Sequence, residues 1–310
     1  MYKAFYRLKR NPFEITPDPS FLFPTTRYKE ALAALYLGVR RHKGVMVLTG
    51  EVGTGKTLLL RTLLQSLEQS NDVAYAYVFN GRLSPVEFLQ YIAGDLGLPA
   101  TSKNKGELLL EIAHYVISCG QKKLITVLVV DEAHHLSAEI LEEIRLLANL
   151  ETPQEKLLQI LLVGQPELDD KLDSHSLRQL KQRVAIRSNL VPLDSDETKG
   201  YIERRLQLAG SPYPSALFPP ETIAAVYQYS QGLPRLINTI CENALLKAHA
   251  RRMRSVSPDI VDDIATDFRL GVHTPQVEEK KASDELDVRQ ATKIMLELYA
   301  RLQAEKVRKL

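Results

Sequence analysis

Eight consecutive residues constrain this chain more than any other part of its sequence. They read Gly50-Glu51-Val52-Gly53-Thr54-Gly55-Lys56-Thr57, which has the form G-x-x-x-x-G-K-T of a phosphate-binding loop (Walker A). An apolar run at 45–48 precedes them and another at 58–60 follows, so we expect a strand, the loop and a helix in that order. Glycines let the main chain wrap closely around a polyphosphate, because they tolerate positive φ and carry no Cβ.

The residue types of this loop match the chemistry of a nucleoside triphosphate bound with magnesium. The N–H groups of the loop and the start of the following helix would face the negative charge of the phosphates. Lys56 could reach the β- and γ-phosphates, and the Thr57 hydroxyl could bind Mg²⁺. All eight residues are therefore candidate contacts for ATP, and Thr57 is also a candidate metal ligand.

Size and composition are those of an ordinary globular protein. The chain has 310 residues, of which 45% are hydrophobic and 25% charged, enough for a large core and two domains. The net charge of +2 does not by itself indicate a nucleic-acid partner. Cys119 and Cys241 lack the spacing of a metal site, and their apolar surroundings favour buried thiols. No apolar run approaches the length that crosses a bilayer, so we expect no transmembrane segment and a cytoplasmic location.

Patterning divides the chain into four parts. Residues 1–26 are rich in proline and aromatic residues and predict an extended arm over a core. Residues 27–192 alternate helical patterns with strands at 73–79, 124–130, 157–163 and 184–190, which predicts an α/β domain with a parallel sheet between helices. Residues 193–270 predict a small all-helical lid with helices at 195–208, 220–229, 233–250 and 257–267. Residues 271–310 predict a polar linker and an amphipathic helix at 284–309.

An acidic pair ends the apolar strand at 124–130. Asp131 at its carboxyl end is a candidate magnesium ligand, and Glu132 is a candidate general base that polarises the attacking water (Walker B). An acidic helix cap is the plain alternative, but a phosphate loop some seventy residues earlier favours the catalytic interpretation.

The same pair opens the sequence Asp131-Glu132-Ala133-His134, which also spells the DEAH box of some helicases. Those enzymes have two sheet domains and a Ser-Ala-Thr segment after the box, whereas this chain has room for one sheet domain and lacks that segment. We therefore set the helicase interpretation aside, and we interpret His134 and His135 as residues at a helix start rather than metal ligands.

Three further polar residues follow predicted elements at informative places. Gln165 follows the strand at 157–163, which we expect beside the strand of the acidic pair, so its side chain could contact the γ-phosphate or orient water (sensor 1); a loop glutamine is the alternative. Arg183 precedes the last strand, where an arginine is expected to face outward and enter a neighbouring subunit's site, with Arg178 and Arg187 as runners-up. Arg235 opens a lid helix, from which it could reach the γ-phosphate (sensor 2). For both arginines, a solvated helix end is the alternative.

Taken together, these motifs resemble those of the AAA+ ATPases, within them the branch typified by general secretion pathway protein A, and those of transposition-type AAA ATPases. The resemblance covers about 1–268 and includes the opening of the chain. It rests on the following segments: Asn11-Pro12-Phe13, Thr16-Pro17-Asp18-Pro19, residues 50–57, Asp131-Glu132, Gly164-Gln165-Pro166-Glu167-Leu168, Gln182-Arg183 and Gly232-Leu233-Pro234-Arg235-Leu236-Ile237-Asn238.

The resemblance implies a magnesium-dependent ATPase that forms a ring or filament and drives assembly or remodelling of a partner. An envelope, secretion or exopolysaccharide system is the first process it implies, with a protein partner at the inner membrane. An ATP-dependent regulator of DNA transposition, bound to duplex DNA, is the alternative, and the basic cluster Arg251-Arg252-Met253-Arg254 is compatible with it. A nucleotide switch without turnover is a third class, against which Glu132 argues.

Overall fold

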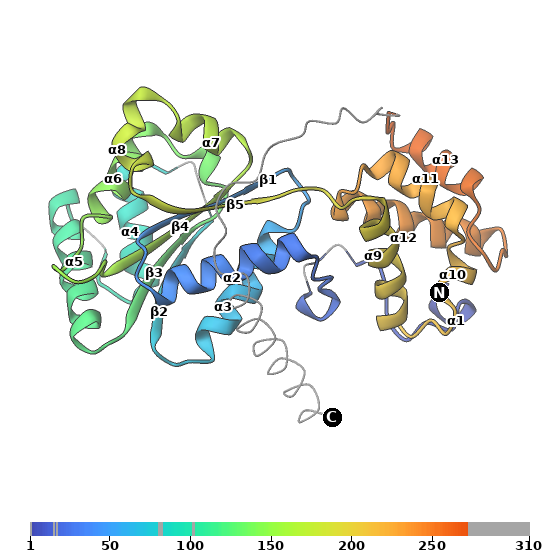
Figure 1. The fold of residues 1–310 in the computed structure, drawn as a ribbon, viewed down its shortest axis with the longest axis horizontal. Helices are drawn as coiled ribbons and strands as arrows, with labels where there is room; N and C mark the ends of the chain where they lie inside the picture. Colours follow the sequence, from blue (N-terminus) through green and yellow to red (C-terminus); the bar gives the residue numbers. More distant parts are fainter. Residues whose placement is uncertain (1, 15, 17, 80–82, 101–102, 272–310) are drawn as a thin grey trace. The chain divides into compact units, whose positions relative to one another are not determined.

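The computed structural model describes residues 2–14, 16, 18–79, 83–100 and 103–271. Their contacts divide into two compact units, which we describe separately (Figure 1). The first, the sheet unit, contains the described residues of 26–51 and 59–190. The second, the helical unit, contains those of 2–25, 52–58 and 191–271. The helix expected at 284–309 lies outside the described residues.

A five-stranded parallel sheet forms the centre of the sheet unit, in the order β2-β3-β4-β1-β5. The strands are β1 (Val45–Gly50), β2 (Val73–Val78), β3 (Ile125–Val130), β4 (Leu158–Gly164) and β5 (Val184–Leu190). This confirms the parallel sheet that the sequence predicts. Because β3, β4 and β1 are neighbours and run in the same direction, the segments that follow them leave from one edge of the sheet.

Helices and short turns connect the strands. They are α2 (Thr26–Arg40), α3 (Lys56–Glu68), α4 (Pro85–Asp95), α5 (Lys105–Gln121), η2 (Ala133–His135), α6 (Ala138–Leu147), α7 (Glu167–Leu172), η3 (His175–Leu177) and α8 (Arg178–Lys181). Polar caps explain where several of them begin. The side chains of Ser84, Asn104 and Ser137 each accept a hydrogen bond from the main-chain N–H three residues on, which satisfies one of the free donors at a helix start.

Alternate residues of the central strands face two layers of helices. Val45 and Val47 pack into a core with residues of α4, α5 and α6. On the opposite face α2 lies against β1 and β5, so closely that a Cβ at Gly38 would lie 2.4 Å from Sδ of Met46 and 2.6 Å from Cδ1 of Ile186. Every residue of β1, β3 and β4 is buried. Coverage of both faces explains why these strands read as continuous apolar runs.

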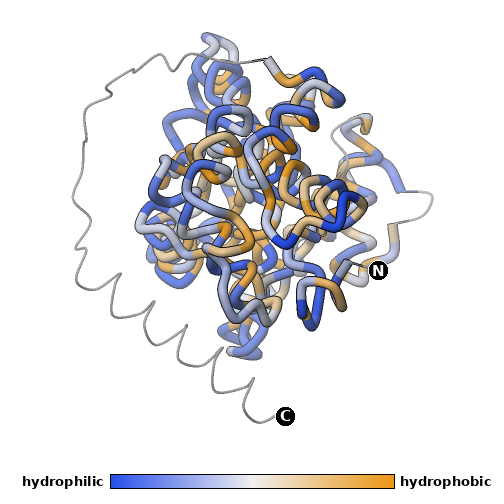
Figure 2. The backbone as a smooth tube through the Cα atoms, turned by 90° about the vertical axis from the view of Figure 1, so that its right-hand side faces the viewer, coloured by the Kyte–Doolittle hydropathy of each residue, from blue (hydrophilic) through white to orange (hydrophobic). Residues whose placement is uncertain are grey.

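The helical unit is built from α9 (Ser195–Leu208), α10 (Pro214–Leu217), α11 (Pro220–Ser230), α12 (Pro234–Ala250) and α13 (Pro258–Asp267). Figure 2 shows apolar and polar segments following one another along the helices, as expected when one face is buried. Four of the five helices were expected from the sequence, and the short α10 was not. Cys241 is buried in this core and Cys119 in the sheet unit, as predicted.

The amino-terminal arm packs with the helical unit and is not fully extended, because it forms α1 (Tyr2–Phe5) and η1 (Pro19–Phe21). The Tyr2 hydroxyl lies 2.8 Å from a carboxylate oxygen of Glu242 on α12 and 2.8 Å from Oδ1 of Asn11. The buried Arg205 of α9 donates from Nε to the carbonyl of Pro12 at 2.5 Å. Within the part of the chain that the structure describes, no helix is long and apolar enough to cross a membrane.

Candidate nucleotide-binding site

The phosphate loop connects β1 to α3, as its sequence predicts. Gly53 and Gly55 adopt φ values of +86° and +101°, which favour glycine over residues with a side chain. A Cβ at Gly55 would meet no heavy atom within 4 Å, so the structure leaves open space beside the loop. Lys56, the first residue of α3, is 7% exposed, and Thr57 is half-buried. Open space beside N–H groups at the start of a 13-residue helix fits a bound phosphate.

Arg235 lies against this loop. Its main-chain N–H donates to the carbonyl of Gly53 at 3.3 Å, and a Cβ at Gly53 would lie 2.7 Å from Cβ of Arg235. Pro234 begins α12, so Arg235 occupies the first turn of that helix. The turn before it depends on Gly232, whose φ is +72° and whose carbonyl accepts a hydrogen bond from Leu193 at 2.9 Å. The structure therefore brings the predicted sensor 2 residue to the phosphate loop.

Asp131 and Glu132 follow β3 with different environments. Asp131 is 7% exposed; its Oδ1 accepts the N–H of Glu132 at 2.9 Å, and its Oδ2 accepts the hydroxyl of Tyr77 at 2.8 Å. Burial, and then the nearby charge of Asp131, raises the pKa of Tyr77, so the phenol stays protonated and continues to donate. Glu132 has φ +52° and ψ +36°, a left-handed conformation that is rare for a residue with a side chain.

The side chain of Glu132 is 47% exposed, but its Oε2 atom is buried and has no hydrogen-bond partner among the described residues. The accessible carboxylate of Glu132 suits a general base, which must reach water, and the buried carboxylate of Asp131 suits a metal ligand. No three His, Cys, Asp or Glu side chains gather as a metal site in the described residues. This is compatible with Mg²⁺, which commonly takes one or two carboxylates and fills its other positions with phosphate and water.

Gln165 follows β4, which pairs with β3, so it leaves the sheet beside the acidic pair as predicted. Its Nε2 lies 2.9 Å from Nε2 of His134 in η2. Lys171 of α7 donates from Nζ to the carbonyls of His134 and Leu136, at 2.6 and 2.8 Å. A Cβ at Gly164 would lie 3.2 Å from the N atom of His134. The segments that follow β3 and β4 are therefore tightly packed against each other.

A second set of contacts joins β1 and β5 to α7, the helix that follows β4. The Thr49 hydroxyl, one residue before the phosphate loop, donates to Oδ2 of Asp169 in α7 at 2.8 Å. Arg187 of β5 donates to Oδ1 of the same carboxylate at 2.8 Å. Sequence reasoning missed Tyr77, Thr49 and Asp169, because their roles depend on which strands become neighbours and none belongs to a recognised motif.

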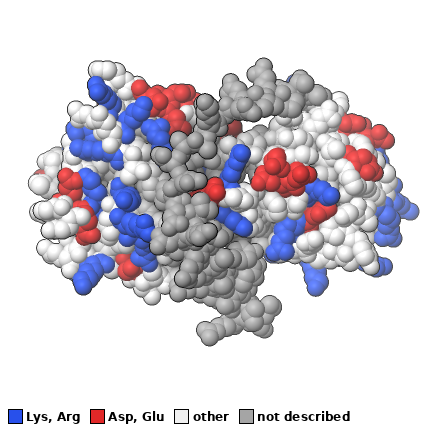
Figure 3. All heavy atoms as spheres, in the orientation of Figure 1, with Lys and Arg blue, Asp and Glu red and all other residues white. Residues whose placement is uncertain are grey.

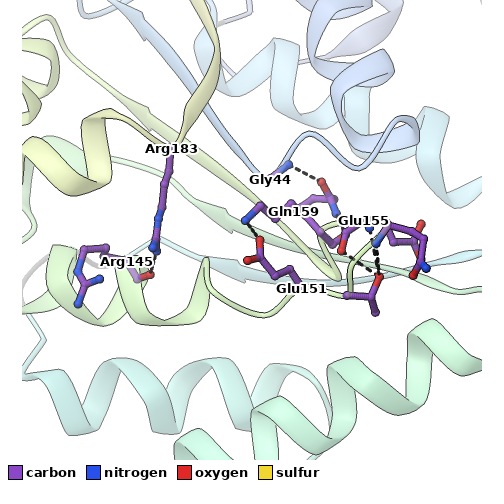
Figure 4. Close-up of polar contacts among 9 residues, drawn as sticks. Gly44, Arg145, Glu151, Glu155, Gln159 and Arg183 are labelled. Atoms are coloured by element: carbon purple, nitrogen blue, oxygen red, sulfur yellow. Dashed lines mark hydrogen bonds and ion pairs between the residues drawn. The ribbon is translucent and has the colours of Figure 1, made fainter.

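Arg183, Arg178 and Arg187, the three candidates for an arginine that enters a neighbouring subunit's site, differ in their contacts. Arg183 does not face outward as expected, because its half-buried guanidinium donates to the carbonyl of Arg145 at 2.7 Å, near the carboxyl end of α6 (Figure 4). The dipole of α6 attracts a cation at this end, which explains the orientation. Arg187 is held by Asp169 and Asp173, whereas Arg178 is exposed.

The parallel sheet order, with a phosphate loop after β1 and an acidic pair after β3 of the same sheet, defines a P-loop nucleotide-binding fold. A family model described as an AAA domain matches residues 39–172. This part of the chain is similar to AAA domains, and the sheet has the fold of AAA+ P-loop nucleoside triphosphatases.

Within that class, the chain is similar to General secretion pathway protein A of Aeromonas hydrophila. The two are 42% identical over 253 residues, which are 81% of this chain and 45% of the relative. The chain thus spans less than half the length of this curated relative.

Two solved structures share the fold at low sequence identity. The ORC2 protein of Aeropyrum pernix, in ADPNP–ADP complexes, has a TM-score of 0.63 and 19% identity, covering 84% of this chain and 72% of that one. Drosophila ORC bound to DNA has a TM-score of 0.65 and 18% identity, covering 87% of this chain and 67% of that one.

Proposed function

We propose that this chain is a magnesium-dependent ATPase whose turnover drives assembly or remodelling of a partner. The observation that carries the proposal is the convergence of three functional segments at one edge of the sheet. The phosphate loop, the Asp131-Glu132 pair and Gln165 leave the neighbouring strands β1, β3 and β4 at their carboxyl ends. Ligands of open parallel α/β sheets bind at this edge.

Each residue then has a role that its surroundings support. Lys56 and the loop N–H groups hold the phosphates, and Thr57 and Asp131 hold magnesium, Asp131 through water. Mg²⁺, when bound, would neutralise charge on the phosphate oxygens. Glu132 accepts a proton from the attacking water, because its side chain is half exposed. Gln165 and Arg235 contact the γ-phosphate.

We further propose a homo-oligomer, a ring or a filament, in which an arginine completes the site of the adjoining subunit. Arg183 remains our first choice for this role, although it must leave the carbonyl of Arg145 to act in trans. Arg178 is exposed and would need no such release. Arg183→Ala and Arg178→Ala decide between them, because the variant that removes the trans-acting arginine should lose turnover alone and should also lower turnover when it is mixed with the wild type. Normal turnover of Arg183→Ala would exclude Arg183.

Similarity to General secretion pathway protein A favours an envelope, secretion or exopolysaccharide system as the process, with a cytoplasmic ATPase acting at the inner membrane. Binding to duplex DNA is the alternative, supported by the fold shared with an ORC structure that is bound to DNA. The predicted basic cluster supports it weakly, because Arg251 pairs with Asp263 and Arg254 donates to the carbonyl of Phe5. Both signs of charge also intermix on the face shown in Figure 3.

The test of the enzyme class is Glu132→Gln, with Glu139→Gln, an exposed glutamate of α6, as the matched control. Removal of the base should lower kcat by about 10²- to 10⁴-fold while ATP still binds. A turnover number equal to that of the wild type would show that Glu132 is not the base. Absence of ATP binding by the wild-type protein in calorimetry with magnesium would remove the whole proposal.

The same variant separates the two processes, since it holds ATP without turnover. A pull-down with Glu132→Gln, with and without nuclease, should retain envelope proteins after nuclease treatment. Recovery of duplex DNA, with an affinity that falls steeply as salt rises, would instead favour the transposition alternative.

A further inference from the structure

His134 lies between the two side chains that the proposed reaction needs most. It belongs to η2, and its side chain is only 7% exposed. Its Nε2 lies 2.9 Å from Nε2 of Gln165, and its Nδ1 lies 3.4 Å from the buried Oε2 of Glu132. His134 has no role in the proposed function, although its ring contacts both Gln165, the candidate sensor, and Glu132, the candidate base.

A neutral imidazole has one N–H donor and one acceptor nitrogen, so it can serve its neighbours in two ways. In the first arrangement the Gln165 amide donates to Nε2, and the proton on Nδ1 points toward Oε2 of Glu132. In the second the amide is turned, so that its oxygen accepts from a protonated Nε2. Nδ1 then accepts the main-chain N–H of Gln165, which lies 3.4 Å away, and offers nothing to Glu132.

Contacts around the His134 ring fix its position, so the ring stays between Gln165 and Glu132 in both arrangements. Lys171 binds the carbonyls on either side of the end of η2, and the close approach at Gly164 presses η2 against the end of β4. The ring of His135 lies against that of His134, with centroids 3.9 Å apart and the planes tilted by 41°. A ring held in place can change its hydrogen bonds more easily than its position.

We propose that His134 is a positioning residue that couples the orientation of the Gln165 amide to the release of Glu132. The inference rests on the proposed function, in which Gln165 senses the γ-phosphate and Glu132 is the base. When the amide N–H points at the ring, Nδ1–H restrains Glu132. When the amide N–H points at the γ-phosphate, the ring carries its proton on Nε2, and Glu132 is free to accept a proton from water. The ring exchanges one proton with solvent between these states and remains neutral.

The experiment uses the full chain with His134→Phe, which keeps a planar ring but removes both nitrogens. His114→Phe, at an exposed position of α5, is the matched control. We expect His134→Phe to lower kcat by about 10- to 100-fold, the loss typical when a group that orients a site residue is removed. We expect the Kd for ATP to change by less than about threefold, because the phosphate loop is untouched. The control should keep the turnover of the wild type.

A double-mutant cycle distinguishes coupling from a general packing defect. If His134 acts through Gln165, then His134→Phe should lower kcat much less in a Gln165→Ala background than in the wild type. Equal losses in both backgrounds would overturn the inference, as would a wild-type kcat in His134→Phe.

Two further results keep the outcomes separate. If His134→Phe fails to fold, His134→Asn takes its place in the cycle, because an amide supplies one donor group and one acceptor. Should the wild-type protein itself hydrolyse no ATP, the proposed function fails, and with it the basis of this inference.

Discussion

Gly232→Ala is the substitution whose effect the structure defines most sharply. Gly232 has φ +72°, and a Cβ there would lie 1.8 Å from the carbonyl oxygen of Leu193 and 2.8 Å from its carbon. These are main-chain atoms, which cannot rotate away. Gly97 offers a matched control, because its φ of +75° is nearly the same but a Cβ there would meet nothing within 4 Å.

The expected cost is the sum of three terms. A left-handed conformation costs a residue with a side chain about 1–2 kcal/mol, and Gly97→Ala should lose this amount alone. Gly232→Ala should also lose about 1 kcal/mol for the hydrogen bond between Gly232 and Leu193, and about 1–3 kcal/mol for overpacking. We therefore expect a total of about 3–6 kcal/mol, roughly 2–4 kcal/mol more than the control.

Amide hydrogen exchange is the suitable assay, because two units of this size need not unfold in one step. The amides around Leu193 and the first turn of α12 should exchange about 30- to 1,000-fold faster in Gly232→Ala than expected from φ strain alone. Arg235 follows three residues later, so ATP turnover should fall as well. Equal local destabilisation in Gly232→Ala and Gly97→Ala would refute the reasoning, since only crowding distinguishes the two sites.

Three other perturbations follow from contacts described above. Arg205→Met should free the amino-terminal arm for limited proteolysis and destabilise the helical unit by about 3 kcal/mol, because the buried carbonyl of Pro12 and the carbonyl of Glu14 lose their donor. Tyr77→Phe should raise the magnesium concentration needed for half-maximal turnover, since Asp131 loses a hydrogen bond that orients it; an unchanged magnesium titration would contradict this. Burial raises the pKa of Glu242, so the native state binds its proton more tightly than the unfolded state does. Wild-type stability should therefore fall relative to Glu242→Gln as pH rises above about 4.5, measured by urea unfolding at each pH.

Local patterns in the sequence were sufficient to predict the strands and most helices. Residues 124–130 are β-branched and apolar because β3 is covered on both faces, and Ser84 and Ser137 mark helix starts because a free N–H there needs an acceptor. The strand that carries Gln165 was correctly placed beside the acidic pair. The four-residue α10 is too short to show a helical period, which is why it was missed.

What the sequence could not predict depends on contacts between distant residues. Tyr2 and Glu242 are 240 positions apart, and the sequence around either residue gives no sign that the two are in contact. Tyr77 looks like any strand residue until the pairing of β2 with β3 places its hydroxyl on Asp131. His134 was interpreted as a helix-start residue for the same reason, because its partner Gln165 lies 31 positions away. The direction of Arg183 likewise depends on where α6 ends.

The arm that joins the helical unit has a consequence for how the protein matures on the ribosome. The helical unit is built from two segments that lie far apart in the sequence. Arg205 of α9 and Glu242 of α12 both bind residues within 2–14. Its core therefore cannot close until the whole sheet unit has been translated. Tyr2, Tyr6 and Phe13 therefore stay unburied until the helices at 195–267 have been translated. During that interval the nascent arm offers an apolar segment that chaperones recognise.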